Sequence, residues 1–283
     1  LEAAFQGAFK KVPFVLHKNV GNGGMAKWRN SDNRLNKLSA VTGDACFYYE
    51  NLATGVCFGH AADKPVVAAS VIKLAVLIEA FRQMDADAVR ANEMFVIART
   101  DKLPSCGALN YLHDGLCVTF RDLCVLMTIL SDNGHELLIK RLGIGNINDT
   151  LRMLGAEKMT LNRLLFDREA SSRGIENYIT AREQLLLKRL YDGEAVSGPA
   201  SEDMLSILKD QRLNGKIPFL LPHSVKIAHK TGEDDGITHD VGIVYARQPF
   251  IVCFCGEHVS PPEFERAMQD ITLMLYENAE RIR

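Results

Sequence analysis

The sequence has no apolar run near the length of about 18 residues that a transmembrane helix needs. It has no excess of one charge either. Its 33 Lys and Arg and 35 Asp and Glu leave a net charge of -2, which argues against nucleic-acid and membrane-surface partners. The seven cysteines are odd in number and include no CxxC pair, so they indicate neither a zinc site nor a disulfide framework. We therefore expect no metal and no other cofactor.

The composition that is present is ordinary for a globular protein. Hydrophobic residues make up 47% and charged residues 24% of 283 positions, which is ample for a large core. Residues 1–7 read like a protease-site remnant from an expression vector, and we place residues 1–24, this remnant and a leader, outside the fold. Because such vectors often start after a removed signal peptide, the absence of a signal says little about export.

Strand patterns lie at both ends of the chain and helix patterns fill the middle. The strand patterns are 45–50, 55–59, 224–229, 240–246 and 249–256, and the helix patterns are 25–41, 66–84, 119–131, 135–142, 147–154, 180–191, 201–211 and 262–281. This order predicts an α/β (α+β) fold with one antiparallel sheet built from both chain ends and flanked by helices. We expect a sheet domain from residues 25–65 and 213–283, with an all-helical domain, 66–212, inserted between.

The first chemical motif is Ser70-Val71-Ile72-Lys73, in the helix pattern 66–84. Ser70 and Lys73 would lie one helical turn apart on one face. A serine hydroxyl is a poor nucleophile until a base takes its proton, and a lysine can be that base if apolar surroundings lower its pKa. The backbone N–H of Ser70, at a helix start, is also a candidate oxyanion donor. S-x-x-K is nevertheless common by chance, so this motif alone does not decide.

Two further motifs follow. Taken alone, Ser131-Asp132-Asn133 is better explained as a helix end entering a turn, and its value comes from its position after Ser70. Lys230-Thr231-Gly232 follows a strand pattern, and there Lys230 at a strand end could place its ammonium in a cleft. The Thr231 hydroxyl could bind a substrate carboxylate, and Gly232 would allow a ligand to approach the backbone closely. Taken alone, this motif could also be an exposed loop after an edge strand.

The order S-x-x-K, S-D-N, K-T-G is the active-site set of class A β-lactamases and penicillin-binding proteins. From about Trp28 to the C-terminus, the order and spacing of the segments also resemble the class A β-lactamase family. The resemblance implies a serine hydrolase in which a β-lactam or related acyl substrate acylates Ser70 and the amide bond of the lactam ring is opened. It further implies a monomer that is exported, periplasmic or at a bacterial cell surface.

The same resemblance implies roles for the motif residues. Lys73 takes the proton of Ser70, and Ser131 with Lys230 passes a proton to the leaving nitrogen. Asn133 would bind the substrate amide. The substrate would also bind along the third motif, at Thr231 and Gly232. The next residue, Glu233, would supply the second N–H of the oxyanion hole.

Two departures from the family pattern concern hydrolysis and recognition. The family carries E-x-x-L-N, whose glutamate activates the deacylating water, but the counted position here is Leu165. The nearby carboxylates Asp167 and Glu169 are not followed by Leu-Asn, so either would be an unusual substitute. The family also often has an arginine after the K-T-G turn to bind the substrate carboxylate, and residues 236–241 contain none.

These departures leave three interpretations open. The first is a β-lactamase-like hydrolase that deacylates slowly. The second is a penicillin-binding, peptidase-like or esterase-like serine enzyme on the same scaffold. The third is a β-lactam-binding sensor that is acylated once and does not turn over.

Overall fold

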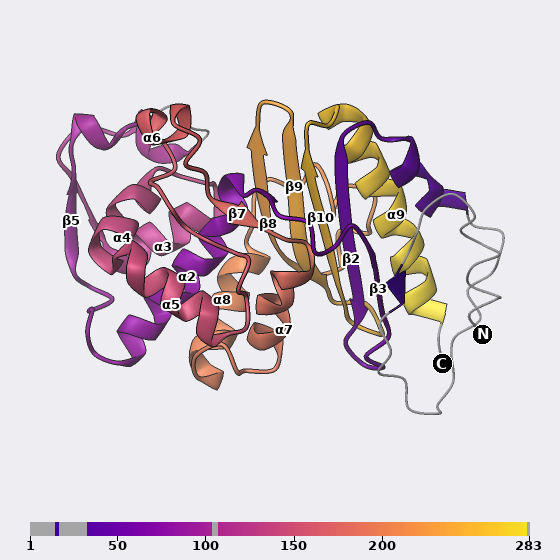
Figure 1. Ribbon diagram of the computed structural model, residues 1–283. Coiled ribbons are helices and arrows are strands. Elements are labelled where there is room, and N and C mark those ends of the chain that lie inside the picture. The colour runs from indigo at the N-terminus through magenta and orange to yellow at the C-terminus, as the bar shows by residue number, and fades with distance from the viewer. Residues whose placement is uncertain (1–14, 17–32, 104–106, 282–283) are drawn as a thin grey trace.

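The computed structural model describes residues 15–16, 33–103 and 107–281 (Figure 1). Its main sheet is antiparallel with the strand order β1-β3-β2-β10-β9-β8, so strands from the two chain ends meet at β2 and β10. This confirms the predicted sheet, except that β1 adds a short strand from the residues that we placed outside the fold. The strands are β1 (Val15–Leu16), β2 (Asp44–Asn51), β3 (Cys57–His60), β8 (Ile227–Asp234), β9 (Ile237–Val244) and β10 (Phe250–Glu257).

Both faces of the sheet are covered, which explains why its central strands are apolar on both sides. Alternate residues point to opposite faces of a strand. Phe47 and Phe254 belong to the apolar cluster that includes Phe264 of α9 (Pro261–Arg281). Cys46 and Cys255 belong to the other cluster, with the helices of the chain middle. Figure 1 shows α9 on one side of the sheet and those helices on the other.

The helical part is organised around α2 (Lys73–Asp85), whose residues Leu74 to Ile78 are all buried. A helix that is apolar on every side is a core helix, and its neighbours supply the surrounding contacts. Those neighbours include α3 (Phe120–Ile129), α4 (Gly134–Leu142), α5 (Ile144–Met153) and α8 (Gly198–Lys209). The remaining helices are α6 (Arg168–Ser172) and α7 (Leu186–Tyr191). None of the described helices is long and apolar enough to cross a membrane.

Short elements complete the described chain. Two small two-stranded sheets pair β4 (Val66–Val67) with β7 (Tyr178–Ile179) and β5 (Met94–Ile97) with β6 (Leu116–Thr119). The 3₁₀ helices are η1 (Asn33–Ala40), η2 (Ala69–Ile72), η3 (Arg99–Asp101), η4 (Ala108–Tyr111) and η5 (Arg182–Leu185).

Three predicted elements need correction. The continuous helix over 66–84 is wrong at its start, because Val66–Val67 pairs with β7 and the 3₁₀ turn η2 precedes α2. The helix predicted over 180–191 begins with the 3₁₀ turn η5. Of the helix predicted over 25–41, the described part is the 3₁₀ helix η1, and residues 25–32 lie outside the described residues.

The third motif is also placed differently from the prediction. The strand pattern 224–229 is shifted, and β8 runs on to Asp234 before a turn at Gly236, whose φ of +68° suits glycine. Lys230, Thr231 and Gly232 therefore lie inside β8 and not at its end. Because β8 is an edge strand of the sheet, this segment can still face a ligand from the side.

Candidate active site

Ser70 lies on a tight turn at the front of α2. The preceding residue, Ala69, has a φ of +41°, a left-handed conformation that disfavours a side chain and breaks any helix at this point. The backbone before the turn is held from both sides. The carbonyl of Val67 accepts a hydrogen bond from Nε2 of His239 at 2.8 Å, and its N–H donates to the carboxylate of Glu257 at 3.3 Å.

His239 is buried and has a fixed tautomer. Its Nδ1 accepts the N–H of Gly256 at 3.0 Å, so the proton is on Nε2, where it reaches Val67. Burial in the sheet lowers the pKa of His239 to about 4. A neutral imidazole therefore connects β10 to the backbone that leads to Ser70.

Two buried lysines meet at Ser131. Nζ of Lys73 donates to the carbonyl oxygen of Ser131 at 2.9 Å, and Nζ of Lys230 donates to its hydroxyl oxygen at 2.6 Å. Lys73 is 2% and Lys230 1% exposed. Ser131 has a φ of +52°, an uncommon conformation for a non-glycine residue. The structure thus brings three of the four predicted catalytic residues into one hydrogen-bonded group.

The turn after Ser131 is fixed by Asp132. Its buried carboxylate accepts the N–H of Asn133 at 2.7 Å and that of Leu109 at 3.0 Å. Gly107 lies so close that a Cβ there would be 2.2 Å from Cγ of Asp132, so a side chain would displace the carboxylate. The side chain of Asn133 points to the same neighbouring loop, with Nδ2 donating to the carbonyl of Leu103 at 2.5 Å. Its Oδ1 is buried and has no hydrogen-bond partner among the described residues.

A cavity of about 350 Å³ opens in front of the turn. It is lined by six of the residues singled out in the sequence: Ser70, Lys73, Ser131, Thr231, Gly232 and Glu233. Gly232 lies against the turn that carries Ser70, because a Cβ on it would be 3.2 Å from the backbone nitrogen of Ser70. The close approach of β8 to Ser70 therefore favours glycine.

The far wall of the cavity is the loop in which we counted the glutamate position to Leu165 from the sequence, although we did not predict the other lining residues or the ion pair. It contributes five lining residues, namely Arg163, Leu165, Phe166, Glu176 and Asn177. An ion pair between Nη2 of Arg163 and the Glu176 carboxylate, 2.5 Å long, joins the two ends of the loop. The side chain of Asn177 accepts the N–H of Arg163 at 3.0 Å at the same place. The two residues of this ion pair are thirteen positions apart in the sequence, and no local pattern distinguishes them from other charged residues.

The two carboxylates considered for deacylation are used elsewhere. Asp167 caps the N-terminus of α6, where its side chain accepts the N–H of Ala170 at 2.9 Å. The side chain of Glu169 is 84% exposed and lies 3.5 Å from the guanidinium of Arg173. Neither residue lines the cavity, where Leu165 takes the counted position.

A buried acid and base lie behind this loop. Phe166 donates its backbone N–H to the carboxylate of Glu136 at 3.2 Å, and its ring lies 5.7 Å from that of His135. Burial, together with the nearby Lys73, lowers the pKa of His135. Glu136 thus anchors the loop from the start of α4.

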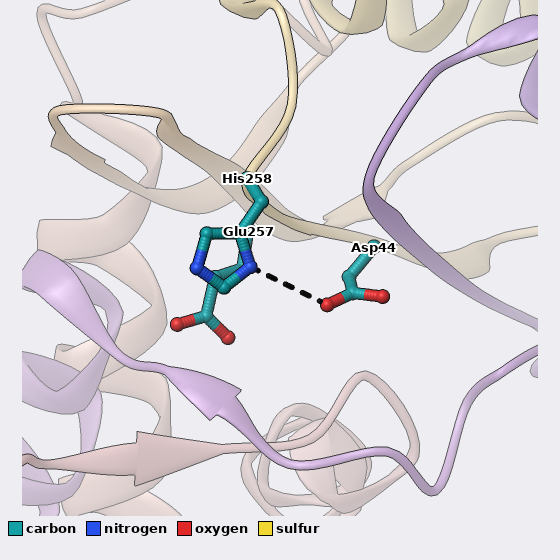
Figure 2. Close-up of side chains that lie close together, drawn as sticks. All are labelled: Asp44, Glu257 and His258. Carbon is teal, nitrogen blue, oxygen red and sulfur yellow. Dashed lines mark ion pairs between the residues drawn. The ribbon is translucent and has the colours of Figure 1, made fainter.

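One group of described side chains could hold a metal ion, where β2 begins and β10 ends, and none of its members lines the cavity. Figure 2 shows Asp44, Glu257 and His258, whose ligand atoms lie within 4.8 Å of one another. The ammonium of Lys64 already lies 2.5 Å from Asp44 and balances its charge. The ammonium of Lys64 therefore supplies the positive charge beside these side chains, and their arrangement does not call for a metal ion.

Comparisons with known proteins agree with this geometry. A family model described as the beta-lactamase enzyme family matches residues 30–279. A solved beta-lactamase from Sphaerobacter thermophilus is 26% identical, with a TM-score of 0.80 over 89% of this chain and 98% of that one. PBP-A is 23% identical, with a TM-score of 0.78 over 89% and 97%. TLA-3, an extended-spectrum beta-lactamase, is 17% identical, with a TM-score of 0.80 over 88% and 98%. None of the curated proteins compared with the chain matches it.

Proposed function

The chain belongs to the beta-lactamase enzyme family, and we propose that it is a serine enzyme that β-lactams acylate at Ser70 and that releases the acyl group slowly. One observation carries the proposal. Lys73 and Lys230 both donate hydrogen bonds to Ser131, which lines the cavity with Ser70. The opposite cavity wall has Leu165 where the family keeps its deacylating glutamate.

Acylation begins with a proton transfer. Lys73 is buried, lies three positions from Ser70 and donates to the carbonyl of Ser131, and it takes the proton of Ser70 as the general base. The oxygen of Ser70 then attacks the lactam carbonyl carbon. The backbone N–H groups of Ser70 and Glu233 receive the resulting oxyanion.

Breaking the carbon–nitrogen bond of the lactam requires a second proton. The hydroxyl of Ser131 donates it to the leaving nitrogen, and Lys230, 2.6 Å from that hydroxyl, supplies the replacement. The Thr231 hydroxyl positions the rest of the substrate. Asn133 does not line the cavity and its side-chain amide donates to Leu103 and Asn110, so the substrate role predicted for it is not part of this proposal. The product of this half-reaction is an ester on Ser70 with the ring opened.

Hydrolysis of that ester needs a base that holds one water molecule. Leucine can neither orient nor deprotonate water. Glu176 is the loop carboxylate that lines the cavity, but Arg163 holds one of its oxygens and the hydroxyl of Ser171 donates to the other at 2.5 Å. We therefore expect deacylation to be slower than acylation.

A second candidate function has the same support. PBP-A is among the solved structures with this fold, and a leucine-to-glutamate mutant of PBP-A is known as an acyl-enzyme complex with penicillin G. The chain could accordingly be a penicillin-binding enzyme that acts on a peptide or ester, or a sensor that is acylated once. These differ from a β-lactamase in the fate of the acyl-enzyme.

The test is a time course with a chromogenic cephalosporin, combined with intact mass spectrometry. We expect a burst that matches the enzyme concentration, then a slow steady state, with the acyl adduct on the peptide that contains Ser70. Ser70→Ala should abolish both the burst and the adduct. Fast turnover without a burst would contradict slow deacylation, and an adduct that persists in Ser70→Ala would contradict the nucleophile. A burst with no steady state at all would favour the sensor.

A further inference from the structure

Three cysteines lie on one face of the sheet where strands from the two chain ends meet. Cys46 of β2 and Cys253 and Cys255 of β10 are all 0% exposed and belong to the same apolar cluster, on the side of the helices. All three are free thiols in the structure. The odd cysteine count predicts no disulfide framework, so any pairing among them is decided by the fold.

The strand register places Cys46 directly opposite Cys255. Their Cα atoms are partners in the antiparallel ladder between β2 and β10. Directly opposite residues project to the same face, with Cα atoms about 4.5 Å or about 5.5 Å apart according to their place in the hydrogen-bonding pattern. A disulfide spans about 4.4–6.8 Å between Cα atoms, so this pair is within range at either place. The next pair in the ladder, Phe47 and Phe254, is in contact on the other face, where the ring centroids lie 5.2 Å apart.

Cys253 fits neither of the other two thiols as well. Its own partner on β2 is Tyr48. It lies diagonal to Cys46, at a Cα separation of about 7–8 Å, and two positions along the strand from Cys255, at about 6.8 Å. Both separations lie at or beyond the upper end of the range that a disulfide spans. The register therefore selects one pair among the three thiols.

Burial determines when these two thiols can react. It raises the pKa of Cys46 to about 12 and the pKa of Cys255 well above its ordinary value. The thiolate is the form that attacks a disulfide, so both cysteines react slowly while β2 and β10 are paired. In the unfolded chain neither thiol is buried. Oxidation is therefore fast only during folding, before the sheet closes.

We propose that Cys46 and Cys255 form a modification site, at which a disulfide joins β2 to β10 when the chain folds in the presence of a disulfide oxidant. The thiolate of one cysteine attacks the oxidant, for example oxidised glutathione, which gives a mixed disulfide and releases one thiol. The thiolate of the other cysteine then attacks the sulfur of the first and releases the second thiol. The two cysteines lose two protons and two electrons, and the oxidant becomes two thiols. Neither cysteine lines the cavity, so the proposal is independent of the acylation chemistry.

The cross-link would join the two ends of the chain at the middle of the sheet. Strands β1 to β3 precede the helical part and strands β8 to β10 follow it, and the ladder between β2 and β10 connects the two groups. The two cysteines are more than two hundred positions apart, so the disulfide removes much conformational freedom from the unfolded chain. Burial also keeps reductants away from the bond once the sheet has closed. The oxidised protein should therefore resist urea better than the reduced protein.

The test is refolding of the fully reduced chain from urea in a mixture of oxidised and reduced glutathione. Samples are then denatured, alkylated with N-ethylmaleimide to mark the remaining thiols, and digested without reduction for mass spectrometry. Cys46→Ala removes one member of the pair. Cys253→Ala removes the equally buried neighbour and is the matched control. Folded reduced protein exposed to the same mixture separates oxidation during folding from oxidation after it.

We expect two fewer alkylated thiols and a cross-linked peptide that contains Cys46 and Cys255. The cross-link should be retained in Cys253→Ala and lost in Cys46→Ala. Oxidation of the folded protein should be at least about 100-fold slower than oxidation during refolding. The oxidised protein should have a urea midpoint about 1–2 M above that of the reduced protein.

Two results would overturn the proposal. One is alkylation of both Cys46 and Cys255 after oxidative refolding, or a cross-link from either of them to another cysteine. The other is a urea midpoint that does not change on oxidation. If Cys46→Ala does not fold, the peptide map of the unaltered protein decides.

Discussion

His239 makes a quantitative prediction about acid stability. Its folded pKa is about 4, against an ordinary value of 6.5, because the ring is buried between Val67 and Gly256. A histidine with a lowered folded pKa binds its proton more weakly in the folded state than in the unfolded state. The free energy of unfolding therefore falls as the pH drops from 6.5 toward 4. At 1.36 kcal/mol per pKa unit, the loss is about 3 kcal/mol.

The assay is urea unfolding of the unaltered protein and of His239→Gln at several pH values from about 7 to about 4. Glutamine can donate to Val67 and accept from Gly256 as the neutral imidazole does, but it does not titrate. His135, also buried with a lowered pKa, contributes in the same direction to both proteins and cancels in the difference. We expect the two free-energy curves to converge by about 3 kcal/mol as the pH falls. Parallel curves over this range would refute the assignment of a buried neutral His239.

Two further predictions concern the covalent chemistry. Lys73→Ala should slow acylation of Ser70 by about 10²-fold or more, the scale of general-base removal, and rapid acylation in this variant, measured by stopped flow, would show that Lys73 is not the base. Leu165→Glu should place a carboxylate in the cavity wall and speed deacylation by about 10²-fold, followed as loss of the acyl adduct by mass. Glu169→Gln, a change at an exposed loop carboxylate, is the matched control and should leave deacylation unchanged. An equal effect of both substitutions would contradict the role given to position 165.

Much of the sheet could be predicted because its signals are local. β2 and β10 each contain an unbroken apolar and aromatic run, residues 45–49 and 250–255, as is typical of strands covered on both faces. The turn between β8 and β9 carries a glycine at Gly236, where φ is positive. These features do not depend on knowing a distant partner, so the pattern of strands at both chain ends was sufficient to give the architecture.

The start of α2 could not be predicted for the opposite reason. Val66 to Ile72 is an apolar run that suits a helix, but Val66 pairs with Ile179 of β7, more than a hundred positions away. The strained conformation of Ala69 then separates this strand from the helix. The pairing of Val66 with a distant strand cannot be read from local periodicity. It is nevertheless this pairing, with the turn at Ala69, that places Ser70 on a turn at the cavity.

The ion pairs of the site could not be predicted from the sequence for a similar reason. Arg163 could have paired with any of several loop carboxylates, and Lys216 lies seventeen positions from its partner Glu233. Surface charges are numerous in this chain, and only the fold decides which of them meet. By contrast, Lys73, Ser131 and Lys230 could be grouped in advance because three motifs in a fixed order constrain one another.

The two halves of the proposed reaction depend on different parts of the molecule. Ser70, Ser131 and Lys230 come from the start of α2, the turn before α4 and a sheet strand, all backed by buried core. Position 165 belongs to a loop joined at its ends by the Arg163–Glu176 ion pair and anchored through Phe166 to Glu136. A substitution in that loop can change how the acyl group leaves Ser70 without moving the groups that attach it. On this scaffold, hydrolase, penicillin-binding enzyme and sensor can therefore be separated by very few residues of one loop.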